Sequence, residues 1–125
     1  EKSPTSFRMS FTLGRAAPMV PVSDMGRALE FYVGKLGFAK SFENGDPVCF
    51  VILKRDAAEI HLSLRQGHTA SSDNLLHLMV DDAAAFYAHL PEASIVKGIR
   101  DADYGVRDFV FADPDGNRID VAQKL

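Results

Sequence analysis

The sequence repeats a pattern of residues at a nearly constant offset, and this repeat limits the possible folds more than any other feature. Four pairs of residues share an offset of 59: Phe50/Phe109, Asp56/Asp115, Ile60/Ile119 and His61/Asp120. Two further matches lie upstream: Val22-Ser23-Asp24 resembles Val80-Asp81-Asp82 at an offset of 58, and Phe31-Tyr32 matches Phe86-Tyr87 at an offset of 55. Internal repeats of this length indicate copies of one supersecondary unit. The chain is therefore expected to contain two related modules.

Each half of the chain predicts the order strand, helix, strand, strand, strand. Apolar residues at helical spacing predict an amphipathic helix over 25–36, which Asp24 can cap and Gly37 can end. The expected strands are 16–22, 38–42, 48–53 and 59–64 in the first half, and 75–80, 94–99, 107–112 and 117–123 in the second, with a helix over 82–90. The fold class is α+β, with an N-terminal tail (1–15), a first βαβββ module (16–64), a linker (65–73) and a second βαβββ module (74–125).

Composition and charge exclude several classes of function. A chain of 125 residues is expected to form one domain, and its net charge of −3 without a basic stripe argues against nucleic-acid binding. No apolar run is long enough to span a bilayer, so no membrane partner is expected. Cys49 is the only cysteine, which rules out an intrachain disulfide, and its apolar neighbours favour a buried, inert thiol. These features favour a cytoplasmic protein.

Each predicted four-stranded sheet has a single helix, which can cover only one of its faces. Alternation along the strands places His61 and Asp120 between core residues but pointing to the other, open face. Such a face suits either a ligand cleft or burial against another sheet. The same alternation assigns Ala17, Met19, Pro21, Leu75, His77 and Met79 to the open faces.

Several of these residues have a second interpretation. His61 can bind a ligand or pair with Glu59, Asp120 or a backbone carbonyl, since buried polar groups need partners in any case. Asp120 can attract a cationic ligand or form an ion pair with Arg107 or Arg118. Phe42 and Phe50 can line a cleft or fill the core, and their apolar character favours the core.

Two sequence motifs resemble those of a known family, the glyoxalase/bleomycin resistance/dioxygenase group. The motifs are Phe31-Tyr32-Val33-Gly34-Lys35-Leu36-Gly37-Phe38 and Asp113-Pro114-Asp115-Gly116-Asn117, and the resemblance extends over residues 17–123. The segment 18–24 and the Gly105-Val106-Arg107-Asp108-Phe109 segment are most similar to the bleomycin resistance proteins.

This resemblance implies paired βαβββ modules whose sheets curl around a cleft that a homodimer completes. It further implies an N-terminal arm exchanged between subunits at a proline such as Pro18, and a ligand that is held without being altered. Tyr104 stands where bleomycin resistance proteins typically have a cleft tryptophan, and an aromatic ring there can stack on a flat ligand. This chain has no tryptophan.

The resemblance also implies four positions at which metal-dependent members carry ligands. In this chain they are Ala17, His61, Leu75 and Asp120, and two of these side chains cannot bind a metal. A shifted set of His61, His77 and Asp120 is the alternative, although metal sites tolerate little displacement. We expect neither a metal nor another cofactor.

The sequence thus predicts a metal-free, homodimeric binding protein of the bleomycin resistance type, with no catalytic residues. Its expected partner is a small aromatic compound that can carry positive charge. The alternatives are a metal-dependent lyase, thiol transferase or dioxygenase of the same group, and a dimeric module with no small-molecule role. The predicted ligand-binding residues are Met19, Phe42, His61, His77, Tyr104, Arg107 and Asp120.

Overall fold

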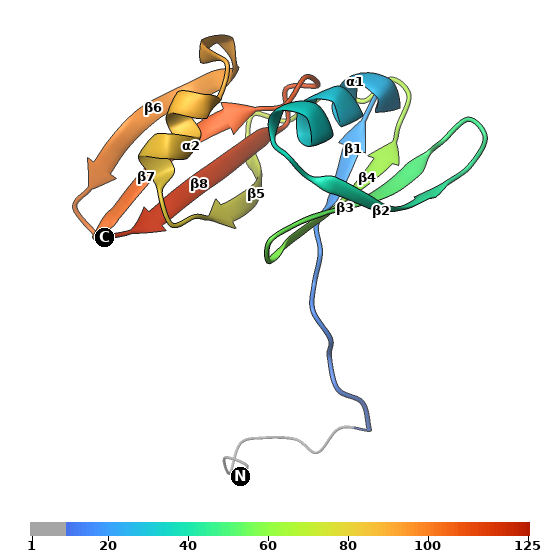
Figure 1. Ribbon diagram of the computed structural model, residues 1–125, viewed down its shortest axis with the longest axis horizontal. Coiled ribbons are helices and arrows are strands. Elements are labelled where there is room, and N and C mark those ends of the chain that lie inside the picture. Colours follow the sequence, from blue (N-terminus) through green and yellow to red (C-terminus); the bar gives the residue numbers. More distant parts are fainter. Residues whose placement is uncertain (1–9) are drawn as a thin grey trace.

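A computed structural model describes residues 10–125, and the first part of the predicted tail lies outside this range. The described chain forms two modules with the same order of elements (Figure 1). The first contains β1 (Met19–Val22), α1 (Met25–Leu29), the π-helical turn η1 (Glu30–Lys35), β2 (Ala39–Asn44), β3 (Phe50–Arg55) and β4 (Ala58–Leu64). The second contains β5 (Asn74–Met79), α2 (Ala83–His89), the 3₁₀ turn η2 (Glu92–Ser94), β6 (Ile95–Ala102), β7 (Val106–Ala112) and β8 (Arg118–Lys124).

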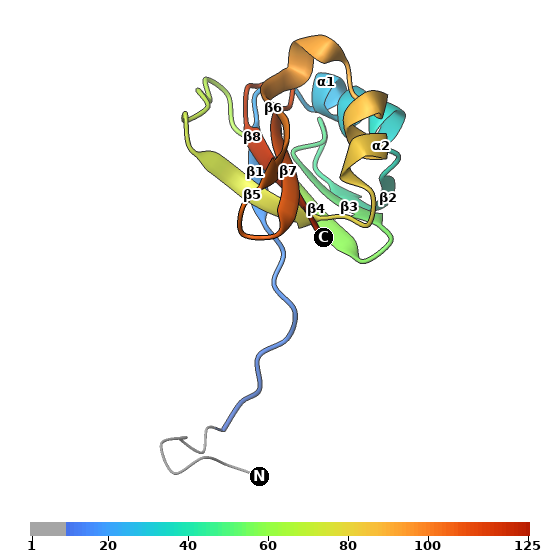
Figure 2. The ribbon, with the colours of Figure 1, turned by 90° about the vertical axis from the view of Figure 1, so that its left-hand side faces the viewer.

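Each module contains one mixed four-stranded sheet. The strand orders are β1-β4-β3-β2 and β5-β8-β7-β6, with a parallel first pair in each sheet and antiparallel pairs elsewhere. Both helices lie on the same side of the molecule, which leaves the other face of each sheet without a helix (Figure 2). The predicted α+β fold with two βαβββ modules is therefore confirmed.

The helix ends follow the local chemistry expected from the sequence. Asp24 caps α1 by accepting a hydrogen bond from the backbone N–H of Arg27, and Asp82 caps α2 in the same way through Ala85. Helix α1 continues directly into η1, so the predicted helix over 25–36 is present in two segments. Gly37 follows with a φ of +77°, a left-handed conformation that favours glycine and ends the helix.

One hydrophobic core joins the two modules. Phe31 of η1 packs against Phe111 of β7 with ring centroids 6.1 Å apart, and Phe111 in turn packs against Phe86 of α2 at 5.5 Å. Phe111 is fully buried. Because rings from both helices meet at one side chain, the modules are expected to unfold together.

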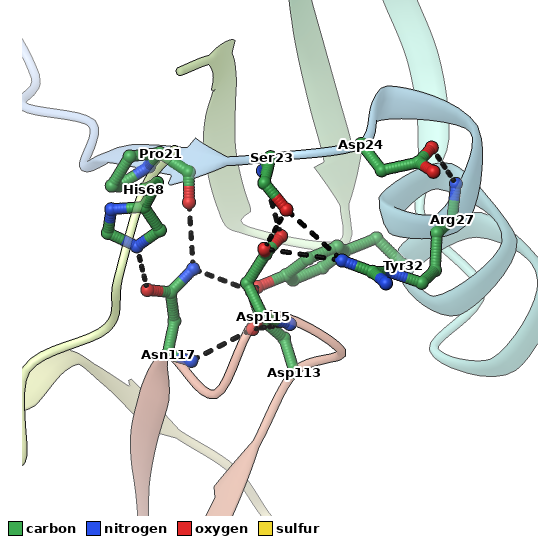
Figure 3. Close-up of polar contacts among 9 residues, drawn as sticks. All are labelled: Pro21, Ser23, Asp24, Arg27, Tyr32, His68, Asp113, Asp115 and Asn117. Atoms are coloured by element: carbon green, nitrogen blue, oxygen red, sulfur yellow. Dashed lines mark hydrogen bonds and ion pairs between the residues drawn. The ribbon is translucent and has the colours of Figure 1, made fainter. Parts of the chain in front are cut away.

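The turn Asp113-Pro114-Asp115-Gly116-Asn117 lies between β7 and β8 and reaches into the first module (Figure 3). Asp113 is buried and accepts four hydrogen bonds, none of them from a charged side chain of residues 10–125. Its Oδ2 accepts from the Tyr32 hydroxyl at 2.8 Å and from Asn117 Nδ2 at 2.9 Å, and its Oδ1 accepts from the backbone N–H groups of Asp115 and Asn117 at 2.9 Å. The carboxylate thereby holds both its own turn and the helix of the other module.

Further contacts from the same turn fix the first module at two more points. Asp115 accepts hydrogen bonds from the backbone N–H of Ser23 at 3.1 Å, from the Ser23 hydroxyl and from Arg27 at 3.4 Å. Asn117 donates to the carbonyl of Pro21 at 2.8 Å, and its side-chain oxygen lies 2.9 Å from the ring nitrogen Nε2 of His68 (Figure 3). The motif that carried much of the family resemblance thus has a structural role between the modules.

Two expectations about single residues are wrong. Cys49 is exposed because it lies in the turn between β2 and β3, just before the buried part of β3. The pairing of Phe50 with Phe109 in the repeat is also wrong, because the registers place Ile52 opposite His61 but Val110 opposite Asp120. Val51, not Phe50, is therefore the counterpart of Phe109, since the connection between the last two strands is effectively one residue longer in the second module.

The N-terminal arm, residues 10–18, extends away from the body of the molecule (Figures 1 and 2). Its Phe11 and Leu13 are 64% and 82% exposed. None of the helices in the described part of the chain has the length and apolarity needed to span a bilayer.

Candidate functional site

Each sheet has an open face, meaning the face that is not packed against the helices. In β1, Val20 and Val22 are fully buried, while Met19, the first residue of the strand, is 52% exposed. In β5, Leu76 is buried while Leu75 and Met79 are 42% and 61% exposed. The alternation predicted from the sequence is thus present in both modules.

The open face of the first sheet carries an aromatic cluster. His61 pairs in register with Met19 on one side and with Ile52 on the other, and Ile52 pairs with Phe42. The rings of Phe42 and Phe50 are 6.2 Å apart, and those of Phe50 and His61 are 5.5 Å apart and nearly perpendicular. Phe42 is half exposed, so both phenylalanines lie on the open face and not in the core.

The imidazole ring of His61 forms a hydrogen bond with a carboxylate on the same face of β4. Its Nε2 lies 2.7 Å from Glu59 Oε2, and the other oxygen of Glu59 accepts hydrogen bonds from Arg15 of the N-terminal arm at 2.8 Å. These two partners, Arg15 first and His61 second, lower the pKa of Glu59 to about 2. The carboxylate therefore stays ionised at neutral pH.

The open face of the second sheet carries a second imidazole–carboxylate pair. His77 and Asp120 are register partners on β5 and β8, and His77 Nδ1 lies 2.6 Å from Asp120 Oδ2. The other ring nitrogen of His77 lies 3.0 Å from the sulfur of Met79. The side chains of His77 and Asp120 are 50% and 29% exposed, so both are accessible to a ligand.

Tyr104 lies in the turn between β6 and β7 at the edge of the same open face. Its ring is 70% exposed, while its hydroxyl donates to Asp108 at 3.3 Å and accepts from Arg100 at 3.4 Å. Arg100 and Asp108 form a shorter ion pair of 3.0 Å with each other. This arrangement leaves the aromatic ring free for stacking while its polar end is held.

Arg107 is the one predicted ligand-binding residue that lies on the wrong face for this role. Strand alternation places it on the side of the buried Phe109 and Phe111, and its register partner Gln123 accepts a hydrogen bond from the first residue of α2. Its guanidinium forms a two-point ion pair with Asp101, at 2.6 and 3.0 Å. Arg107 therefore lies toward the helix and does not pair with Asp120.

The residues at the family's metal positions do not fit a metal ion. Ala17 and Leu75 offer no donor atom, and His61 and Asp120 lie on different sheets with partners of their own. Within residues 10–125, no three His, Cys, Asp or Glu side chains lie close enough to hold one metal ion. The shifted set of His61, His77 and Asp120 is accordingly not assembled within this single chain. That the protein works without a metal stays a prediction.

A hollow of about 930 Å³ lies between the modules among η1, the β3–β4 turn and α2. Its lining includes Leu36, Phe38, Arg55, Leu78, Asp82 and Phe86. Of the open-face residues named above, Met79 alone borders it. A smaller hollow of about 230 Å³ lies near the linker, between Pro21 and Leu75.

Sequence reasoning named Glu59 only as a possible partner of His61, and it missed two further charged residues that the structure places at the open faces, Arg100 and Asp108. Glu59 lies two residues before His61 on the same strand, so the spacing already put both on one face. Arg100 could not be placed, because β6 pairs with β7 through two register shifts.

The two βαβββ modules, each with one open sheet face, agree with a family model that the sequence matches. The model of the glyoxalase/bleomycin resistance protein/dioxygenase superfamily matches residues 12–121. The chain therefore belongs to this superfamily.

Solved structures with the same fold include proteins that bind antibiotics. TnmS3, an antibiotic-binding protein from Streptomyces sp. CB03234, is 27% identical with a TM-score of 0.69, covering 94% of this chain and 100% of its own. A superfamily member from Sphaerobacter thermophilus DSM 20745 is also 27% identical, with a TM-score of 0.73 and coverage of 90% and 98%. A bleomycin resistance determinant encoded on transposon Tn5 is 24% identical, again with a TM-score of 0.73 and coverage of 90% and 98%, and shows the shared fold. No curated protein matches the sequence.

Proposed function

We propose that this protein binds and sequesters a small aromatic compound on the open faces of its sheets, without altering it chemically. The observation that carries the proposal is the combination of accessible aromatic rings with two carboxylate-backed imidazoles on faces that no helix covers. Aromatic side chains stack on flat ligands, and ionised carboxylates attract positive charge. The structural similarity to TnmS3, an antibiotic-binding protein, supports the same kind of ligand.

The ligand-binding residues that we propose are Met19, Phe42, His61, His77, Tyr104 and Asp120. They come from both sheets, and each lies at an open face or its edge. Phe50 joins them because it packs between Phe42 and His61. Arg107 is left out because it lies toward α2.

We further propose that a second copy of the chain covers these faces and completes the cleft. The apolar side chains Met19, Phe42, Leu75, Met79 and Tyr104 are exposed on these faces or at their edge, and exposed apolar patches often mark sites of protein association. The arm, with its exposed Phe11 and Leu13, supplies additional apolar surface for the partner.

Sedimentation velocity tests this second copy. A folded dimer should persist on dilution, because separation would expose both the open faces and the arm to water. A folded monomer that remains stable at low concentration would contradict the proposed dimer.

Removal of the open-face carboxylate is expected to weaken binding without unfolding the protein. Asp120→Ala and His61→Ala should each change the free energy of unfolding by less than about 1 kcal/mol, since both side chains are partly exposed together with their hydrogen-bond partners. Calorimetric titration with bleomycin and with proflavine, a cationic acridine, should show an affinity reduced about tenfold in Asp120→Ala.

Asp101→Asn is the matched control, because Asp101 is also an ion-paired carboxylate but bonds Arg107 on the helix side. Its affinity should equal that of the unmodified protein. An equal loss in Asp101→Asn and Asp120→Ala would mean that net charge, and not the open face, governs binding. A collapse of stability in His61→Ala or Asp120→Ala would assign these residues a structural role instead.

A further inference from the structure

The N-terminal arm is connected to the open face through a chain of three side chains, Arg15, Glu59 and His61. Arg15 Nε and Nη2 each lie 2.8 Å from Glu59 Oε1, and Glu59 Oε2 lies 2.7 Å from His61 Nε2. Arg15 is 71% exposed, whereas the side chains of Glu59 and His61 are only 11% and 22% exposed. We propose that Arg15 and Glu59 are positioning residues that fix His61 as a hydrogen-bond acceptor toward the ligand, so that the seating of the arm governs which ligands bind. This inference rests on the proposed ligand-binding role of the open face.

The hydrogen-bond direction follows from the chemistry of the partners. An ionised carboxylate can only accept hydrogen bonds, so the Nε2 atom of His61 must be the donor in its contact with Glu59. A neutral imidazole carries one proton, which this contact assigns to Nε2. The lone pair on Nδ1 is then left to accept a hydrogen bond.

Arg15 holds the Glu59 carboxylate in place for this contact. The hydrogen bond from Arg15 is the largest cause of the low pKa of Glu59, and the hydrogen bond from His61 comes second. Arg15 also occupies Oε1 through two nitrogens, which leaves Oε2 for His61. Lys54, the register partner of Glu59 on β3, adds positive charge nearby.

The His61 ring is held on a second side by Phe50, whose ring is 5.5 Å away and nearly perpendicular to it. Among residues 10–125, the hydrogen bonding of the His61 ring runs through Nε2. A ring that is restrained by both a carboxylate and an aromatic neighbour keeps one orientation.

The consequence for ligand choice is specific. A fixed acceptor next to aromatic rings favours flat compounds that carry an N–H or O–H group and disfavours compounds that present only acceptors. Because Arg15 belongs to the arm and not to the sheet, any rearrangement of the arm removes its bonds to Glu59 and loosens His61.

Glu59→Gln tests the proposed proton position without any ligand. The amide oxygen should remain on the Arg15 side and its NH₂ group should face His61, so that Nε2 must accept and the ring proton must move to Nδ1. Nitrogen-15 spectra of histidine-labelled protein at pH 8.5, with the His61 signals assigned through His61→Asn, distinguish the two tautomers. We expect the Nε2–H form in the unmodified protein and the Nδ1–H form in Glu59→Gln. The Nδ1–H form in the unmodified protein, or the same spectrum in both proteins, would overturn the proposal.

Arg15→Gln tests the contribution of the arm, with Arg65→Gln in the linker as the control for a lost positive charge. The His61 signals of Arg15→Gln should change from one tautomer to an average of two, whereas those of Arg65→Gln should not change. Identical His61 signals in Arg15→Gln and the unmodified protein would show that the arm does not position the ring.

Two cationic probes then test ligand choice. Proflavine carries two amino groups, and acridine orange is the same ring system with both amino groups fully methylated. The unmodified protein should bind proflavine about tenfold more tightly than acridine orange, and Glu59→Gln should lose this preference. The same preference in both proteins would overturn the role of His61 in ligand choice. Failure of both probes to bind either protein would contradict the proposed function, while the tautomer measurement would still decide the role of Arg15 and Glu59.

Discussion

Asp113→Ala is expected to lower the free energy of unfolding by about 3 kcal/mol or more, the largest effect of any single polar substitution in this chain. The buried Asp113 carboxylate accepts hydrogen bonds from the Tyr32 hydroxyl, from the side chain of Asn117 and from two backbone N–H groups (Figure 3). Its removal leaves the Tyr32 hydroxyl and the two backbone N–H groups without this acceptor, while the Asn117 side chain keeps only its bond to the carbonyl of Pro21. Urea unfolding followed by circular dichroism measures the loss.

Asp24→Ala is the control for this experiment, because Asp24 also accepts a backbone hydrogen bond but is exposed at the start of α1. It should cost about 1 kcal/mol, the usual value for a helix cap. Equal losses in Asp113→Ala and Asp24→Ala would contradict a special role of Asp113 between the modules.

Tyr32→Phe should remove part of the same network, at a cost of about 1–2 kcal/mol near neutral pH. Burial, and next the negative charge of Asp113, raise the pKa of Tyr32 well above the ordinary tyrosine value of 10.0. The unfolded chain therefore releases this proton first, and stability that is fully present below about pH 10 is lost as the pH rises further. This alkaline loss should be smaller in Tyr32→Phe, so an unchanged alkaline profile would contradict the assignment.

Phe111→Ala is expected to cost about 3–5 kcal/mol and to destabilise both modules together. Its fully buried ring contacts Phe31 of the first module and Phe86 of the second. Hydrogen exchange should show that amides in β4 and in β8 lose protection by the same factor. Loss of protection in the second module alone would mean that the modules are independent.

Phe42→Ala is the matched control, since Phe42 is also a sheet phenylalanine but is 51% exposed on the open face. It should change the free energy of unfolding by less than about 1 kcal/mol. The comparison separates the joint core from the proposed ligand face with the same chemical change.

The alternation of apolar residues was sufficient to predict most of the fold. Ile60, Ile119 and Val121 are buried as predicted, while His61 and Asp120 between them point to the open faces. This succeeded because strand alternation is a local property that depends on the backbone alone. The internal repeat predicted that the chain contains two modules.

The errors arose where residues of the two modules were matched by a constant offset, which ignores the different lengths of the connecting turns. Phe50 and Phe109 are 59 residues apart in the sequence, yet they lie on different faces because the two modules differ in the connection before the last strand. Arg107 was assigned to the cleft from its neighbours in the sequence, although it shares the face of Phe109. Counting alternation from Phe109 would have placed it correctly.

The polar contacts between modules could not be predicted, because they join residues that are far apart in the chain. Asp113 and Tyr32 are 81 positions apart, and Asp115 and Ser23 are 92 apart. Arg15 and Glu59 are separated by 44 positions and belong to elements whose contact the sequence does not indicate. Such pairs become visible only when the register of every strand is known.

Methyl spectra of methionine-labelled protein provide the most direct test that the open faces bind the ligand. Met19 and Met79 lie on the open faces and are 52% and 61% exposed, whereas Met25 is buried as the first residue of α1, and Met9 lies outside the described residues. On titration with metal-free bleomycin or proflavine, the Met19 and Met79 signals should shift and saturate while the Met25 signal stays in place. Met19 is decisive, because Met79 also borders the groove between the modules. An unchanged Met19 signal with every probe, or a shift at Met79 alone, would contradict ligand binding on the open faces.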